Sequence, residues 1–314
     1  MTHHIADPSF ERLDLLMLQS FPVHPSSSGL NRFDGGSLRL RFERRDEALG
    51  SALVRCEQQP PLKVVRAFSL EDSAALVHLH NLSGGVLGGD HLELFVEVGP
   101  EARAQLTSTG ATRLYRSRSE APTATQLNSV KVCENGLLEY VPDALIPFAG
   151  ARYSQETVIR LAAGAGLFWW EMVGPGRVAR GELFEYELLH VKLDILALGK
   201  PLAQERIRLE PAKRSLSSTA RLGPYHYFST FYICRVGLEA GRWQELEKEL
   251  AELACQLSRP AEILWGVSLL SADGLVVRAL GVKGRAIEAG LLAFWHAAKL
   301  ALYGQAAIPP RKVH

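Results

Sequence analysis

The sequence predicts a mainly β protein in which short strands stack in a β-helix-like or sandwich arrangement, with two α-helices near the C-terminus. The first observation is an alternation of apolar and polar residues in short runs that fill the first two-thirds of the chain. The second is the placement of Gly, Pro and Asn between these runs. The third is a change, near residue 240, to apolar residues spaced three and four apart. Alternation is typical of half-buried strands, and the longer spacing is typical of helices.

The strand pattern is clearest at residues 37–44 and 91–98. In the first run Leu38 and Leu40 alternate with arginines, and in the second run leucine and valine alternate with His and Glu. Successive side chains of a strand point to opposite faces, so each run would bury one face only. Similar runs, each expected to be a strand, occur at residues 74–80, 104–108, 127–132, 137–141, 154–161, 184–195 and 204–209.

Two dipeptides, Asn135-Gly136 and Asp273-Gly274, are typical of tight hairpins because Asn, Asp and Gly accept the positive φ that such turns need. The second is expected to join strands at residues 263–270 and 275–280.

The two helices are predicted at residues 242–257 and 285–303. In the first, Trp243, Leu246 and Leu250 fall on one side of a helix, and the second segment repeats this spacing.

Composition favours a folded protein without a strong electrostatic partner. The 314 residues are 47% hydrophobic and 22% charged, which is ordinary for a globular chain. The net charge of +1 provides no long-range field for nucleic acid or an anionic membrane, so neither is an expected partner. A single domain over residues 1–314 is expected, with residues 1–30 as a flexible leading segment.

Targeting signals and cysteine pairs are not evident. The nearest approach to a membrane span, residues 289–303, is too short and contains His296 and Lys299. The N-terminus lacks the pattern of a secretory signal. The four cysteines are widely spaced and form no CxxC pair, so a reducing, cytoplasmic location is expected.

The most unusual local sequence is GGVLGGD at residues 84–90. The spacing of Gly84 and Gly89 matches a phosphate-binding loop, but Asp90 stands where that loop needs Lys, and a strand follows in place of a helix. The segment is therefore interpreted as a turn between two strands. Its four glycines predict positive φ values or the close approach of another backbone.

Two other groups of residues could carry chemistry. The run at residues 106–117 holds hydroxyls and arginines that could bind an anion, although a strand end with a basic edge is favoured. His78, His80 and His91 could be metal ligands, or could act with a carboxylate in an all-β enzyme. No GxSxG, HExxH or Cys/His cluster supports an enzyme.

Carboxylates recur along the strands, at Asp90, Glu93, Glu139, Glu171 and Glu182 among others. Glu171 follows an apolar run that ends in Trp169-Trp170, so it is expected to be partly buried and to need a partner, for which Arg177 or Arg180 would serve.

Taken together, these segments resemble the urease accessory protein D family (UreD, called UreH in some species). The resemblance rests on GGVLGGD at 84–90, GATRLYRS at 110–117, LEYVP at 138–142, Trp170-Glu171, Gly176-Arg177, the run from Gly181-Glu182 to Phe184, Phe294-Trp295 and Pro309-Pro310-Arg311. It spans roughly residues 38–311. Arg113 stands where the family often has Lys, and Leu82 stands where it often has Pro. The residues carried over as structural signatures are Gly84, Gly85, Gly88, Gly89, Gly110, Arg113, Tyr115, Arg116, Gly176, Arg177 and Gly181.

The resemblance implies a non-enzymatic scaffold for urease maturation. Such a protein would bind UreF, join the GTPase UreG through it, dock on the urease structural subunits and pass nickel to the active site. It implies a β-rich fold with two helices, which would be the docking surface for UreF. No permanent cofactor is expected, only a transient nickel ion. The five carboxylates Asp90, Glu93, Glu139, Glu171 and Glu182 are the candidates for its path, with Asp90 and Glu171 expected to line a passage.

Overall fold

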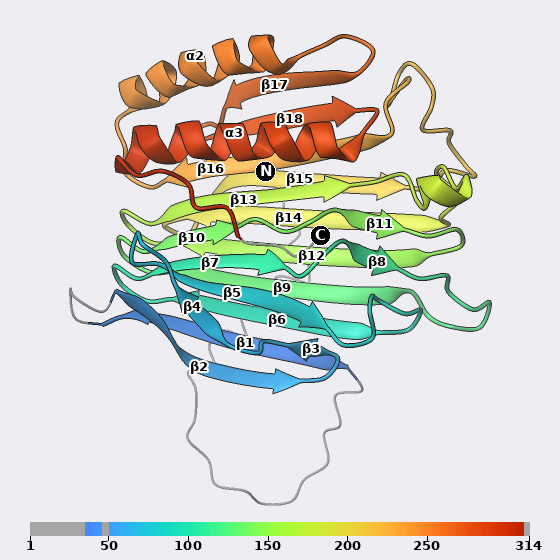
Figure 1. Cartoon of the computed structure of the whole chain (residues 1–314), viewed down its shortest axis with the longest axis horizontal. Helices are drawn as coiled ribbons and strands as arrows, with labels where there is room; N and C mark the ends of the chain where they lie inside the picture. Colours follow the sequence, from blue (N-terminus) through green and yellow to red (C-terminus); the bar gives the residue numbers. More distant parts are fainter. Residues whose placement is uncertain (1–34, 46–49, 311–314) are drawn as a thin grey trace, which may run out of the picture. The chain divides into compact units, whose positions relative to one another are not determined.

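Two β-sheets share one apolar core in the computed structural model, which describes residues 35–45 and 50–310. The expected flexible segment, residues 1–30, lies outside the described residues, and residues from Gly35 onward form one compact unit. The seven-stranded sheet consists, in spatial order, of β15 (Lys200–Leu209), β14 (Leu188–Ala197), β12 (Arg152–Leu161), β9 (Ala124–Val132), β6 (His91–Val98), β1 (Gly36–Arg44) and β2 (Ser51–Gln59) (Figure 1).

The second sheet has eleven strands. In spatial order its main path is β17 (Ile263–Leu269), β18 (Gly274–Gly281), β16 (Tyr227–Arg235), β13 (Gly166–Val173), β10 (Leu137–Tyr140), β7 (Arg103–Ser108), β5 (Ala75–Asn81) and β3 (Leu62–Lys63). The short strands β4 (Ala67–Ser69), β8 (Thr112–Leu114) and β11 (Leu145–Pro147) pair alongside this path.

The chain winds from one sheet to the other and back. From β5 to β14 successive long strands alternate between the sheets, and neighbours within each sheet, such as β9 and β12 or β7 and β10, run parallel. Figure 1 shows the resulting stack of strands. The mainly β fold with a β-helix-like stack, expected from the sequence, is confirmed.

Alternation explains how the inner faces are formed. Leu38, Leu40, Leu94 and Val96 of the seven-stranded sheet are buried against Val77 and other apolar residues of the eleven-stranded sheet. Arg39 and Glu97 lie on the opposite face, as the period of two requires.

Besides the short strands β3, β4, β8 and β11, three long strands were not predicted, at Ser51–Gln59, Gly166–Val173 and Tyr227–Arg235. The last two are buried on both faces for most of their length, so they read as continuous apolar runs without alternation. The strand expected at 184–195 begins only at Leu188, because Phe184 has a positive φ of 58° in the irregular segment that follows the 3-10 helix η1 (Val178–Arg180).

The hairpin predicted at Asn135-Gly136 is wrong. This turn joins β9 of one sheet to β10 of the other, so its two strands do not pair. Asn135 does have a positive φ of 55°, and its N–H donates to the Ala163 carbonyl of the next turn in the stack (3.0 Å). The Asp273-Gly274 hairpin is confirmed: it joins β17 to β18.

The helices α2 (Ala240–Leu257) and α3 (Gly284–Tyr303) cover the other face of the eleven-stranded sheet. Trp243, Leu246 and Leu250 of α2 are buried there, as the sequence predicted. Phe294 and Trp295 of α3 pack in the same cluster, and α3 lies over β16 and β18 (Figure 1). Within the described residues, neither helix has the length and apolarity needed to cross a membrane.

A buried ion cluster fastens α3 to the sheet. The Lys299 side chain is 0% exposed, and its Nζ lies 2.6 Å from Asp72 Oδ2 and 2.6 Å from Glu139 Oε1. Burial raises the pKa of Glu139 to about 7, although the Lys299 ammonium opposes this shift. Two carboxylates thus share one cation in a site without solvent, which makes the cluster sensitive to loss of that cation.

We expect Lys299→Met to lower the free energy of unfolding by about 3–5 kcal/mol, because two buried carboxylates lose their cation. Urea unfolding followed by circular dichroism measures this change. Lys248→Met, on the exposed side of α2, is the matched control and should shift stability by less than about 0.5 kcal/mol. Equal unfolding midpoints for the two variants would show that the cluster contributes little.

Candidate functional site

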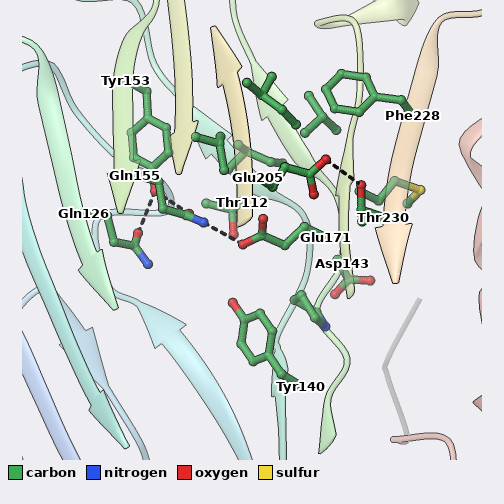
Figure 2. Close-up of a pocket in the computed structure, with 16 residues that line it drawn as sticks. Thr112, Gln126, Tyr140, Asp143, Tyr153, Gln155, Glu171, Glu205, Phe228 and Thr230 are labelled. Carbon is green, nitrogen blue, oxygen red and sulfur yellow. Dashed lines mark hydrogen bonds between the residues drawn. The ribbon is translucent and has the colours of Figure 1, made fainter. Parts of the chain in front are cut away.

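A polar cavity interrupts the apolar core between the sheets. It has a volume of about 70 Å³, enough for a few water molecules. Glu171 of β13 and Glu205 of β15 extend into it from opposite sheets, with Gln155 of β12 and Tyr140 of β10 beside them (Figure 2). Two inward carboxylates in one core are costly to bury, so the cavity is a candidate for function.

Glu171 is held by an amide and not by an arginine. Gln155 Nε2 donates to Glu171 Oε1 at 2.6 Å, and Figure 2 shows this contact across the cavity. The expectation that Arg177 or Arg180 would be its partner is wrong, because Arg177 pairs with Glu182 instead. An uncharged partner leaves the negative charge of Glu171 uncompensated.

The pKa of Glu171 reflects that environment. Burial, with a smaller contribution from the charge of Glu205, raises the pKa from 4.5 to about 7, although the Gln155 hydrogen bond opposes the shift. Near neutral pH the Glu171 carboxyl can therefore gain or lose a proton readily.

Glu205 has several partners at the same cavity. Its carboxylate accepts a hydrogen bond from Tyr232 Oη (2.8 Å) and forms an ion pair with Arg278 Nη2 (3.2 Å). Sequence reasoning missed Glu205 as a candidate. It lies in an alternating strand between Gln204 and Arg206, and only the facing sheet reveals which side of that strand is inside.

Two further cavities adjoin the first. One, of about 280 Å³, shares Thr112, Gln126 and Tyr140 with it and extends to the glycine turn. The other, of about 670 Å³, shares Glu205 and Thr230 with it and opens beside β17 and β18. The two carboxylates thus lie in the middle of three adjoining spaces.

The glycine turn is built as the sequence suggested. Gly84 and Gly89 have positive φ values of 73° and 90°. A Cβ on Gly85 would lie 2.4 Å from the Arg113 carbonyl oxygen, and one on Gly88 would lie 2.8 Å from Ser117 Cα. Both predicted reasons for the glycines, positive φ and a passing backbone, are confirmed.

The other signature residues extend this contact into a stack of loops. Tyr115 packs edge-on against the Phe148 ring, and the guanidinium group of Arg177 lies over the same ring, 4.4 Å from its centroid. A Cβ on Gly150 would meet the Arg116 side chain at 3.0 Å. Gly181 ends η1 with a φ of 79°. Gly110 and Arg113 line the 280 Å³ cavity, and Gly176 has a φ of 136°.

Four of the five predicted nickel-path carboxylates lie away from the cavity. Asp90 Oδ2 accepts the Leu87 N–H (2.9 Å) and closes the glycine turn, and Asp90 lines none of the three spaces. Glu93 is on the outer face of β6, 3.6 Å from His91 Nε2. Glu139 belongs to the cluster under α3, and Glu182 is paired with Arg177. Of the five, Glu171 alone lines one of the three spaces.

The three histidines do not form one site. His78 packs edge-on against Phe68, and His80 lines the 280 Å³ cavity. His91 is in the other sheet, where its Nδ1 lies 2.6 Å from Thr125 Oγ1. Among residues 35–45 and 50–310, no group of three or more His, Cys, Asp or Glu side chains is arranged to hold a metal ion.

The pKa of Glu171 predicts a pH-dependent stability. Between pH 4.5 and about 7 the folded protein keeps a proton that the unfolded chain has released, so the free energy of unfolding falls as pH rises through this range. Glu171→Gln, which mimics the protonated form, should match the wild type at pH 4 and exceed it at pH 8 by on the order of 2 kcal/mol.

Urea midpoints at the two pH values test this, and Glu139 contributes the same pH dependence to both proteins. A difference between wild type and variant that does not change with pH would contradict the assignment.

Comparison with known proteins identifies the family to which the chain belongs. The family model described as UreD urease accessory protein matches residues 34–314. A urease accessory protein UreD from Herpetosiphon aurantiacus is 45% identical over 279 residues, which cover 89% of this chain and 96% of that protein. One from Photorhabdus laumondii is 29% identical over 298 residues, 93% of this chain and 89% of that protein. The match over nearly the whole chain shows that it belongs to the UreD family of urease accessory proteins.

Proposed function

We propose that this protein passes nickel to the active site of apo-urease, as part of a cytoplasmic complex with UreF and UreG. Membership of the UreD family supports a non-catalytic role in urease maturation. Free cysteines at all four positions, Cys56, Cys133, Cys234 and Cys255, support a reducing compartment. The exposed sides of α2 and α3 stay the predicted docking surface for UreF.

The observation that carries the proposal is the line of adjoining cavities with Glu171 and Glu205 at its centre. The space of about 70 Å³ shares lining residues with the space of about 280 Å³ at the glycine turn and with the space of about 670 Å³ beside β17 and β18. Such a line supports a route for a small ion between the two sheets.

The donor set suits an ion in transit. Carboxylate and amide oxygens from Glu171, Glu205, Gln155 and Gln126 are harder ligands than the thiolates and imidazoles of high-affinity nickel sites, so they would bind the ion weakly. Because Glu171 titrates near pH 7, binding an ion would release a proton, and reprotonation would help to release the ion.

We expect the double variant Glu171→Gln/Glu205→Gln to reduce activation of apo-urease by about tenfold or more, the scale typical of losing groups that support metal binding. The measurement is urease activity after incubation of apo-urease with UreF, UreG, GTP, nickel and the variant. Gel filtration should show that the variant still joins the accessory complex. Glu249→Gln, exposed on α2, is the control. Full activation by the double variant would exclude this route.

Asp90→Ala separates a structural from a metal-handling role for the glycine turn. The loss of the Leu87 hydrogen bond should lower the free energy of unfolding by about 1 kcal/mol and leave urease activation unchanged. Thermal unfolding and the same activation assay measure both effects. Loss of activation by a folded Asp90→Ala protein would return Asp90 to the nickel path.

A further inference from the structure

The largest of the three spaces is a groove at the end of the stack. Its volume of about 670 Å³ lies in the range of clefts that enclose ligands. Its walls are β15 on one side and β16, β18 and β17 on the other, and the segment between β15 and β16 adds Leu216, Arg221 and Leu222. The groove exists because the two sheets end at different places.

The seven-stranded sheet ends at β15, whereas the opposite sheet continues beyond β16 to β18 and β17. Glu205 of β15 contacts Tyr232 of β16 and Arg278 of β18, so β15 lies opposite these strands. Among the described residues no strand pairs with the outer edge of β15. One extended segment added there would continue the shorter sheet.

The floor of the groove is apolar. Leu264 of β17 is 37% exposed, and it points away from Ile263 and Trp265, which pack toward the helices. Phe228 and Leu280 line the same floor. Apolar side chains of an incoming strand would be buried here.

The charged lining is basic. Its ionisable members are Glu205 and four arginines, Arg206, Arg208, Arg221 and Arg278. Arg278 is 60% exposed in its ion pair with Glu205, and Arg208 pairs with Glu210 at the surface. The side chains of Arg278 and Arg208 are 60% and 55% exposed, so a carboxylate from solvent can reach both guanidinium groups. Arg206 is held more firmly, because its Nη2 lies 2.7 Å from Oδ1 of buried Asp194.

We propose that this groove binds an extended, acidic segment of a partner protein, with apolar side chains at alternate positions. The apolar residues would face Leu264, Phe228 and Leu280, and the carboxylates would meet the arginines. Strand addition of this kind gains affinity from the backbone and specificity from alternate side chains. The apolar floor favours a peptide over a polyphosphate.

Binding of the acidic segment does not depend on nickel transfer, but it would affect a residue of the proposed nickel route. A carboxylate that draws Arg278 away would leave Glu205 without its ion pair at the mouth of the inner cavity, a consequence that rests on the proposed function. The test below measures peptide binding alone, so its failure would leave that function standing.

The probe is a fluorescein-labelled peptide, Glu-Leu-Asp-Phe-Glu-Leu-Asp, titrated with the purified full-length protein and followed by fluorescence anisotropy. We expect saturable binding that weakens as salt is raised. Arg278→Glu and Leu264→Asp should each weaken it by about tenfold or more. Matched controls are Arg44→Glu, on β1, and Leu269→Asp, on β17 outside the groove and 44% exposed. Both should bind as the wild type does.

Other outcomes would overturn the proposal. These are no saturable binding, equal losses in the control variants, or equal affinity for a peptide of the same composition with its acidic and apolar residues segregated. Binding of oligouridylate as tightly as the peptide would assign the groove to nucleic acid. Concentration-dependent dimers in light scattering that Leu264→Asp abolishes would assign it to a second copy of the chain.

Discussion

The contact between the inner faces of the two sheets is the constraint on which the rest of the structure depends. From β5 to β14 the chain crosses repeatedly from one sheet to the other, so each long strand of this part must supply one row of side chains to the same apolar core. Leu40, Val96 and Val130 meet Leu106, Leu138 and Leu167 across this core. The second face of the eleven-stranded sheet then needs its own cover, which α2 and α3 provide. Any polar group in the shared core must be satisfied within it.

The proposed nickel route lies where the apolar contact between the two sheets is interrupted. Where Glu171 and Glu205 replace apolar residues, the sheets cannot close against each other, and a polar space remains. Gln155 and Tyr232 supply hydrogen bonds in place of solvent. Burial and the charge of Glu205 raise the pKa of Glu171 to about 7 against the opposing Gln155 hydrogen bond, whereas an arginine in place of Gln155 would have fixed the negative charge. The same chemistry that makes the cavity costly gives it an exchangeable proton.

Local patterns predicted those elements whose cause is local. β6, α2, α3 and the glycine turn were expected from alternation, helical spacing and backbone freedom. The candidate site was harder to predict from the sequence, because it brings together residues that are far apart in the chain. Glu205 looked like any polar strand residue, and Glu139 could not be assigned to Lys299, 160 positions later, before the packing of α3 was known. The Asn135 turn shows the same limit: its φ was predictable, but which strands it joins depends on the winding of the whole chain.

The loops packed against the glycine turn at residues 84–90 have a practical consequence for anyone who labels this protein. Gly85 and Gly88 each leave no room for a single added carbon without displacing the backbone of a neighbouring loop. A tag or fluorophore inserted there would disturb several loops at once. The β14–β15 turn is different: the Leu198 side chain is 64% exposed and could be replaced, while Gly199, with a φ of 77°, would be kept as glycine. A dye attached at this turn could report on complex assembly and would leave the loops around the glycine turn unchanged.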